Sequence, residues 1–213
     1  MTTVSQPRTA RGRRAARPSG DDRELAILST LERLLEVRPF AEISVDDLAK
    51  GAGISRPTFY FYFASKDAVL LTLFERVIAE ADARFGGRAE DYVADPARAW
   101  REGFYAFFEP LRAHLGVALA GVAATATNAE IGELWSAYMQ KWIDGTAAII
   151  TAERTRGAAP ETVPAQDLAA ALNLMNERTM FASYTSQKPS IAEDAALDTL
   201  AHVWITSIYG RTP

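Results

Sequence analysis

Apolar residues recur along the chain at spacings of three and four, in runs that glycine, proline and short polar residues separate. This is the period of an α-helix with one buried face, whereas a half-buried strand alternates apolar and polar positions. No stretch alternates in that way, so the sequence predicts an all-α fold. The first run predicts a helix from the acidic pair 21–22 to about Arg38, before Pro39. Its inner side is expected to carry Leu25, Leu28, Leu31 and Leu35.

Two short helices are predicted next. Ser44 and Asp47 have the Ser-x-x-acid spacing of a capping box, which satisfies free N–H groups at a helix start. Gly53 tolerates the backbone conformation at that helix's end, Ser55 caps the second helix, and Pro57 fits its first turn. This outline is typical of a helix-turn-helix that places its second helix in the major groove of DNA. A plain helical hairpin of an all-α core has the same outline.

The aromatic run in the second short helix bears on that choice. Phe59 and Phe63 are four residues apart and are expected to face the core. Tyr60 and Tyr62 carry hydroxyl groups that a purely apolar core would have to satisfy. These two side chains are better placed at a DNA phosphate, so the run favours the helix-turn-helix.

The remaining runs predict a connecting helix and a larger helical domain. The connecting helix spans residues 67–87 and stops at Gly86-Gly87. After a polar connection at 88–94, a helix begins near Asp95-Pro96, carries an aromatic stripe and is ended by Pro110. A segment of small residues follows. The last predicted helices span about 129–156, 167–184 and 192–209.

The chain is therefore expected to divide into three parts with about nine helices. Residues 1–20 form a flexible Arg-rich arm, residues 21–66 a helix-turn-helix DNA-binding domain, and residues 67–213 the larger domain with its connecting helix. With 213 residues, 48% of them hydrophobic, the chain can bury such a core. It has no cysteine, which agrees with a reducing cytoplasm. No apolar run reaches the roughly 18 residues of a membrane-spanning helix, so we expect a cytoplasmic protein without a membrane partner.

The formal net charge of −4 hides an asymmetry between the two ends of the chain. Residues 1–66 hold eleven Lys and Arg against eight Asp and Glu, a balance of +3, and the remaining residues have a balance of −7. A protein that binds phosphates needs only one basic face. The arm either orders on DNA, in the minor groove or along phosphates, or stays a solvated tail, and the sequence leaves both open.

The string from Gly53 to Lys66, GISRPTFYFYFASK, resembles the helix-turn-helix signature of the TetR family of transcriptional repressors. This signature is long and specific and belongs to the first third of the chain. The resemblance implies an all-helical repressor whose larger domain binds a ligand and forms a dimer on operator DNA. The residues expected at the DNA are Ser44, Ser55, Arg56, Thr58, Tyr60, Tyr62 and Lys66.

Within this set, Arg56 and Thr58 can reach base edges or phosphates, and the two tyrosines and the lysine are expected at the DNA backbone. Phe61 stands where many family members have a polar or basic residue. Its ring can contact a thymine methyl but cannot form a hydrogen bond. We therefore expect few direct hydrogen bonds between this helix and the base edges. DNA shape, or several dimers side by side, would then supply specificity.

All four tryptophans lie beyond residue 99 and raise the question of a ligand pocket. A tryptophan stripe at helical spacing is by itself more often plain core than a binding site. Asn173 and Asn176, three apart on an otherwise apolar helix, favour the binding site. Buried amides need partners, and they serve as polar anchors in apolar pockets.

Three segments of the larger domain, at 133–143, 170–183 and 204–210, resemble one family member in particular, a ligand-responsive repressor of a flavin monooxygenase gene. That resemblance implies a hydrophobic tunnel along Trp100, Gly103, Phe107, Trp135, Met139, Trp142, Asn173, Asn176 and Trp204. Gly145 stands where a larger aromatic is expected, which would widen or re-route the pocket floor.

The two final helices are expected to form a homodimer interface of four helices, because the family pairs them with their symmetry mates. Small residues such as Ala170 and Ala182 allow close approach. Two intramolecular core helices fit the sequence equally well. Only the two-fold symmetry of operator binding favours the dimer.

The sequence contains none of the common catalytic motifs that we considered. The only histidines are His114 and His202, and the zinc-protease, serine-hydrolase and phosphate-loop motifs are absent. We expect no enzymatic activity, no metal and no cofactor. The sequence predicts a ligand-responsive repressor that binds operator DNA as a homodimer, is released by a hydrophobic small molecule and controls a monooxygenase gene. The alternative is a DNA-binding protein without a ligand, whose tryptophans are plain core.

Overall fold

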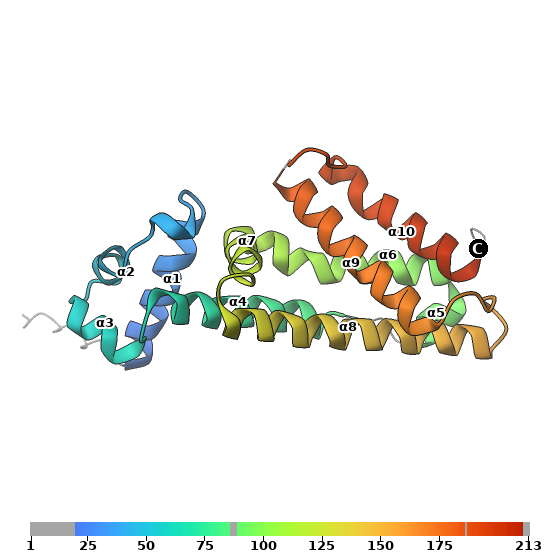
Figure 1. The fold of residues 1–213 in the computed structure, drawn as a ribbon, viewed down its shortest axis with the longest axis horizontal. Coiled ribbons are helices and arrows are strands. Elements are labelled where there is room, and N and C mark those ends of the chain that lie inside the picture. The colour runs from blue at the N-terminus through green and yellow to red at the C-terminus, as the bar shows by residue number, and fades with distance from the viewer. Residues whose placement is uncertain (1–19, 86–88, 186, 211–213) are drawn as a thin grey trace, which may run out of the picture.

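The structure, a computed structural model, describes residues 20–85, 89–185 and 187–210. The predicted arm and the Gly86-Gly87 helix stop lie outside the described residues. The described residues form ten α-helices and one 3₁₀ turn without a strand, so the all-α prediction is confirmed (Figure 1). The elements are α1 (Gly20–Leu35), η1 (Phe40–Glu42), α2 (Val45–Gly51), α3 (Arg56–Tyr62), α4 (Lys66–Ala83), α5 (Ala89–Ala94), α6 (Pro96–Ala113), α7 (Leu115–Ala124), α8 (Ala129–Thr155), α9 (Ala165–Tyr184) and α10 (Glu193–Tyr209).

A head of three helices, α1 to α3, lies at one end of the molecule (Figure 1). Its second and third helices begin at the capping residues that the sequence predicts. Ser44 Oγ accepts from the Asp47 N–H at 3.1 Å, and Asp47 Oδ2 accepts from the Ser44 N–H at 2.9 Å, which completes the predicted capping box. Gly53, in the turn between α2 and α3, has a φ of +67°, which favours glycine. Phe59 is fully buried and faces the core of the head as expected.

Helix α1 is shorter than predicted and presents a different inner side. It ends at Leu35, where the Arg38 N–H turns back to the Leu34 carbonyl at 3.0 Å. Leu25, expected inside, is 51% exposed. Ile27, fully buried, takes the inner position instead, together with the other predicted leucines.

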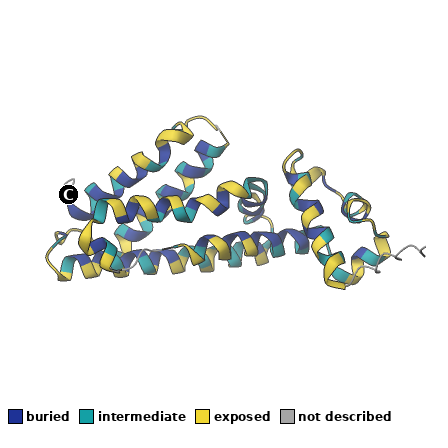
Figure 2. Ribbon diagram, turned by 180° about the vertical axis from the view of Figure 1, so that it is seen from behind, coloured by how far each residue is buried: buried dark blue, intermediate teal, exposed yellow. Residues whose placement is uncertain are grey.

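Helix α4 leaves the head and runs along the body of the molecule (Figure 1). It packs against α1 in the head and against α6, α7 and α8 in the body. Helix α9 packs on α8, and α10 packs on α6 and α9. Buried residues follow the faces along which these helices meet (Figure 2). Phe74 of α4 lies directly over Gly121 of α7, where an added Cβ would come within 2.2 Å of the ring.

The predicted end of α6 at Pro110 is wrong, because the helix continues to Ala113. Proline removes one helix hydrogen bond. The additional turn offsets that loss: it buries Leu111, which is 2% exposed, and the Pro110 carbonyl accepts from the His114 N–H at 3.0 Å.

The polar connection predicted at 88–94 is also wrong where it is described, since α5 occupies most of it. Tyr92 of α5 is buried and its ring lies against Trp100, with 4.9 Å between centroids. This single apolar anchor had no helical period around it, so no pattern pointed to a helix. The segment of small residues after α6 forms α7.

The head touches the body at a second place besides α4. Gly116, in the first turn of α7, lies so close to α1 that an added Cβ would come within 2.9 Å of the Leu35 carbonyl oxygen. Beside it, His114 Nδ1 shares a hydrogen bond with Glu32 of α1. The position of the head therefore depends on two contacts, one through α4 and one through α7.

Candidate DNA-binding surface and ligand pocket

The second short helix, α3, presents an unusual aromatic face to solvent. Phe61 is 82% exposed and Tyr60 46% exposed. Water disfavours an uncovered aromatic ring, so such exposure indicates a surface that meets a partner. In a helix-turn-helix this helix enters the major groove, where a ring can contact a thymine methyl.

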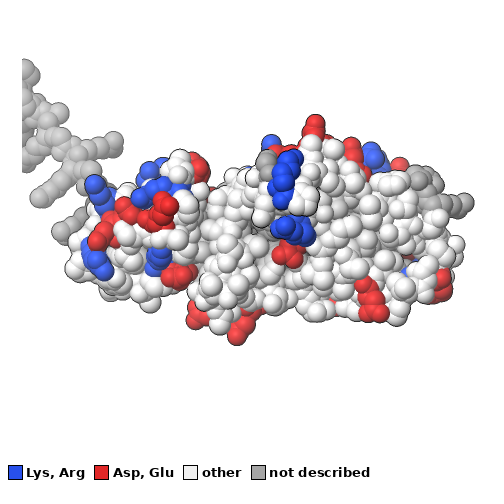
Figure 3. All heavy atoms as spheres, turned by 45° about the horizontal axis from the view of Figure 1, so that its top comes forward, with Lys and Arg blue, Asp and Glu red and all other residues white. Residues whose placement is uncertain are grey.

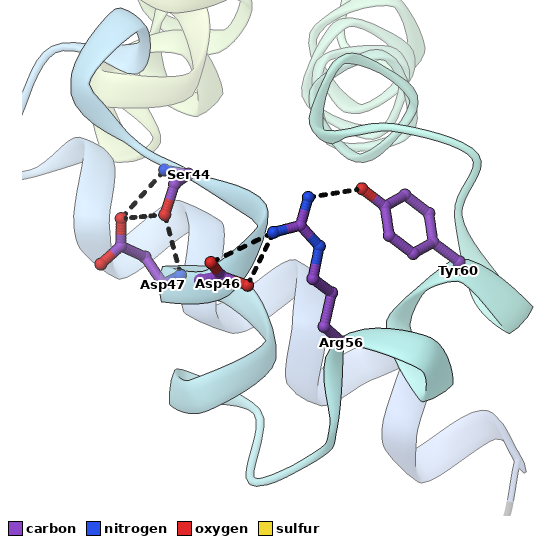
Figure 4. Close-up of polar contacts among 5 residues, drawn as sticks. All are labelled: Ser44, Asp46, Asp47, Arg56 and Tyr60. Carbon is purple, nitrogen blue, oxygen red and sulfur yellow. Dashed lines mark hydrogen bonds and ion pairs between the residues drawn. The ribbon is translucent and has the colours of Figure 1, made fainter.

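Arg56 is held between an acid on α2 and a hydroxyl on its own helix (Figure 4). Its Nη1 donates to Asp46 Oδ1 and Oδ2 at 3.3 and 3.2 Å, and its Nη2 donates to the Tyr60 hydroxyl at 3.3 Å. The bond to Tyr60 and the charge of Asp46 raise the pKa of Arg56 still further. Because its side chain is 56% exposed, the guanidinium is accessible but already oriented, and DNA must compete with Asp46 for it.

Three of the predicted DNA-binding residues take part in helix capping. Ser44 Oγ donates to Asp47 Oδ2 at 2.7 Å, and hydrogen bonds from the Ser44 backbone and side chain lower the pKa of Asp47. The Ser55 and Thr58 hydroxyls share a hydrogen bond of 2.8 Å, and the Thr58 N–H donates to Ser55 Oγ at 3.3 Å. These groups fix the starts of α2 and α3 and so set the orientation of α3.

Lys66 is placed differently from the expectation. Its Nζ donates to the carbonyl oxygens of Phe40 and Ile43 at 2.9 and 2.8 Å and lies 4.5 Å from the centroid of the Phe40 ring. These bonds engage the ammonium and join η1 to the start of α4. Lys66 thus lies at a structural junction and not on the outward face of α3, while Tyr62 is half-buried.

The described head is not basic by itself. Residues 20–66 hold six Lys and Arg against eight Asp and Glu, and the two kinds are interspersed over the head (Figure 3). Arg38 lies 3.6 Å from Asp47, and Arg56 lies 3.2 Å from Asp46. The positive balance of this end of the chain therefore comes from the five arginines within residues 1–19.

The nine residues predicted to form a tunnel all line one cavity inside the body, and they come from α6, α8, α9 and α10. Their rings pack closely. Trp100 and Trp204 have centroids 4.9 Å apart, and the ring of Phe107 meets Trp142 edge-on at 4.8 Å.

In this conformation the rings fill most of the cavity. The volume open to the centre of a water-sized sphere is about 40 Å³, within a lined space of about 600 Å³. Phe85 lies against Gly145, where an added Cβ would come within 2.8 Å of the ring, so the pocket floor expected to widen at this glycine is filled. Ligand pockets usually offer about 300–1,000 Å³. A ligand therefore has to move these rings apart.

The two buried amides have partners in the protein. Asn173 Nδ2 donates to Thr146 Oγ1 at 3.1 Å and to the Ala169 carbonyl at 2.9 Å. Asn176 Oδ1 accepts from Trp204 Nε1 at 2.8 Å, which joins α9 to α10 across the pocket wall. Trp100 Nε1, by contrast, is buried without an acceptor in hydrogen-bond geometry among the described residues. Trp100 does interact with the Tyr209 hydroxyl, an interaction that acts to lower the pKa of Tyr209, so the indole lies near a polar group of the protein.

Two rings of the pocket are attached to α4, the helix that carries the head. Trp142 Nε1 donates to Asp82 Oδ1 at 3.1 Å, and the ring of Phe74 stacks on Trp135 with 5.7 Å between centroids. A displacement of either tryptophan therefore acts directly on a side chain of α4.

The sequence interpretation missed several residues of the site. Asp46 was not among the predicted site residues, although it pairs with Arg56. Glu177 follows Asn173 and Asn176 at the helical spacing i, i+3, i+4, and this spacing was a usable signal. The further lining residues are Phe85, Tyr92, Phe104, Phe108, Leu111, Glu177 and Phe181.

Comparison with known proteins decides the family. Residues 27–73 match the family model of bacterial regulatory proteins, tetR family, and residues 100–210 match that of the transcriptional regulator EthR, C-terminal domain. The chain is 62% identical over 214 aligned residues, 99% of each chain, to the HTH-type transcriptional regulator EthR of Mycobacterium tuberculosis. The chain belongs to the TetR family. It is an EthR-type transcriptional repressor that binds DNA, and not an enzyme.

Two further comparisons agree with this family. The chain is 60% identical to EthR of Mycolicibacterium smegmatis, which covers 100% of this chain and 98% of the relative. Among solved structures, FadR of Thermus thermophilus, a TetR-family repressor in complex with lauroyl-CoA, shares the fold with a TM-score of 0.58 at 18% identity and covers 85% of this chain and 93% of FadR. TetR-family proteins typically bind operator DNA as dimers and respond to small molecules.

The described residues contain no group of three or more His, Cys, Asp and Glu placed to hold a metal ion. In the same part of the chain, no single helix is long and apolar enough to cross a membrane. One pair, α7 with α8, passes by length and composition but bends by 108° at its break.

Proposed function

We propose that this TetR-family repressor binds its operator as a homodimer and is released when a hydrophobic small molecule enters the pocket between α6, α8, α9 and α10. The convergence of nine predicted residues on one aromatic cavity carries this proposal.

The DNA contact is proposed for the outward side of α3, with Arg56, Tyr60 and Phe61 at its centre. Thr58, Ser55 and Ser44 lie at or near the helix starts beside them. Arg56 is the one group of this set that can bind a guanine or a phosphate with two donors, and its orientation is already fixed by Asp46 and Tyr60.

The dimer is proposed to form through α9 and α10. Leu174 of α9 is 53% exposed, which is unfavourable for a large apolar side chain in an isolated chain. Replacement of Leu174 by glutamate is expected to give monomers in sedimentation velocity and weak operator binding. A variant that stays dimeric would show that the dimer interface does not include this part of α9.

The effector acts by preferring one of two states of the dimer. It weakens operator affinity only by the ratio of its affinities for those states. The resemblance to a repressor of a flavin monooxygenase gene makes the promoter of such a gene the first operator to test.

The deciding experiment is an electrophoretic shift with the DNA upstream of the protein's own gene and its neighbours, with competitor DNA, repeated with a long hydrophobic ester or amide. A specific shift that the compound releases supports both parts of the proposal. In that assay Trp100→Ala and Asn176→Ala are expected to keep the shift and to change the effector concentration needed for release.

A specific shift that no apolar compound releases supports the alternative, a DNA-binding regulator whose aromatic cluster is core. Loss of the shift in both pocket variants, with intact folding by circular dichroism, contradicts separate sites for DNA and ligand.

A further inference from the structure

Glu177 is the one carboxyl group among the described residues that line this largely aromatic pocket. It lies on α9, half-buried, beside Trp135 of α8, and its interaction with Trp135 acts to lower its pKa. Phe181, one turn further along α9, lines the same pocket, and its ring meets Trp135 edge-on at 6.4 Å between centroids. An acid thus lies near aromatic rings in the lining of a largely apolar cavity.

This acid has no cation to balance it within the described chain. No described Lys or Arg forms a salt bridge with Glu177, and none contributes to its titration. Burial raises the pKa of Glu177, and the interaction with Trp135 lowers it. A partly buried carboxylate without a positive partner is unfavourable, and a plain core would have an apolar side chain here.

We propose that the Glu177 end of the pocket receives the positively charged head of an amphiphilic effector, a primary or quaternary ammonium that carries a hydrocarbon tail. This inference rests on the proposed ligand function of the same pocket. Glu177 supplies the opposite charge, and the aromatic rings that line the pocket with it, such as Phe181, supply cation–π attraction. The tail follows the aromatic cavity towards Trp100 and Trp204.

The same arrangement determines which molecules are rejected. A fatty acid would bring its carboxylate to Glu177, and two like charges at short range in a poorly solvated site repel each other. A neutral alcohol or ester gains from burial of its tail but has no charge to pair. Glu177 is therefore a specificity-determining residue that ranks cations above neutral molecules and neutral molecules above anions.

The test uses three probes with the same eight-carbon tail, octyltrimethylammonium, octan-1-ol and octanoate, each well below its micelle concentration. Isothermal titration calorimetry measures their binding to the full-length protein. The expected order is ammonium, alcohol, octanoate, with at least about tenfold between the first and the last. Equal or tighter binding of octanoate overturns the proposal.

Glu177→Gln removes the charge and keeps a group that can accept from Trp135. This variant is expected to bind the ammonium about tenfold more weakly and the alcohol as the wild type does. Glu133→Gln, an exposed glutamate on α8, is the matched control and should leave all three affinities unchanged. Thermal unfolding of each variant confirms that it is folded. If Glu133→Gln weakens the ammonium as much as Glu177→Gln, the effect is one of net charge and the proposal fails.

The same measurements distinguish failure of the charge preference from failure of the proposed ligand function. If the alcohol and the ammonium bind alike and Glu177→Gln changes neither, the pocket binds ligands but the charge preference is wrong. If no probe binds and none releases the operator, both the preference and the ligand function are wrong.

Discussion

The indole N–H of Trp142 is bonded to the Asp82 carboxylate at 3.1 Å, which fastens one wall of the pocket to α4. At a rise of 1.5 Å per residue, the 18 residues of α4 make a rod about 27 Å long. A tilt of about 10° in such a rod displaces its far end by about 5 Å. Because α4 also packs against α1 of the head, a ring that moves in the pocket can shift a DNA-binding head.

Asp82→Ala is expected to weaken the effector response while operator affinity without effector stays within about threefold of the wild type. Without the bond, movement of Trp142 reaches α4 less completely, and couplings of this kind amount to about 1–3 kcal/mol. We expect at least about fivefold more effector to be needed for half-release in an operator titration.

Lys141→Ala is the matched control for Asp82→Ala. It removes the other partner of Asp82, whose ammonium lies 2.6 Å away, and keeps the Trp142 bond. A normal response in Lys141→Ala together with a weak one in Asp82→Ala assigns the coupling to the indole. Equal loss in both variants would assign it to the ion pair.

Asp46→Asn is expected to strengthen operator binding, because the acid competes with DNA for Arg56. Exposed ion pairs are weak, so the gain should not exceed about fivefold. Fluorescence anisotropy with labelled operator measures it. Glu42→Gln, an exposed acid elsewhere on the head, makes the same change in net charge, and an equal gain there would rule out a specific role for Asp46.

Phe61→Ala is expected to leave thermal stability unchanged, because the ring is 82% exposed, and to reduce the ratio of specific to non-specific DNA binding about tenfold. The ratio comes from competition between operator and random duplex. Phe59→Ala provides the contrast: this ring is fully buried, and its loss should destabilise the head by about 3–5 kcal/mol. An unchanged ratio in Phe61→Ala would show that the Phe61 ring does not contribute to sequence recognition.

Truncation of residues 1–19 tests the charge of the head. The remaining head is net acidic, so operator affinity should fall, and the slope of log K against log salt should become shallower by about 0.9 for each phosphate that the shortened protein no longer neutralises. Affinity measured at several salt concentrations gives the slope. An unchanged slope identifies this segment as a tail that does not meet DNA.

Stability is expected to fall at alkaline pH. Burial, with a contribution from Glu193, raises the pKa of Tyr184 to about 12, and burial and a bond to Glu153 raise the pKa of Tyr209 as well. Both groups favour the folded state while neutral. Their contribution is full below the unfolded pKa of about 10 and is lost as the pH rises through the folded values. Denaturant titrations at pH 8 and pH 11 should show a smaller loss for Tyr184→Phe.

Local chemistry explains what the sequence predicted well. Caps such as Ser44 and Ser55 and the buried ring of Phe59 depend on neighbours within four residues, so their signals are complete in the sequence. The nine pocket residues were identified together through a resemblance to a known protein, whereas periodicity by itself favoured a plain core.

The contacts that the sequence did not predict share a tertiary cause. Lys66 meets the carbonyl of Phe40, 26 residues away, and no local pattern indicates such a partner. Pro110 remains inside α6 because Leu111 is buried against other helices. Asp46 meets Arg56 across the turn only once the angle between α2 and α3 is fixed.

The nearly closed pocket has a consequence for how this repressor sets its threshold. With about 40 Å³ open in this conformation, its own rings occupy the place of the ligand. Under the proposed function, an effector competes with Phe85 and Phe107 for the same space, and its apparent affinity is its intrinsic affinity multiplied by the fraction of molecules in which that space is open. Aromatic packing would then determine the sensitivity of the proposed response, so substitutions that never touch an effector would change the effector concentration needed to release the operator.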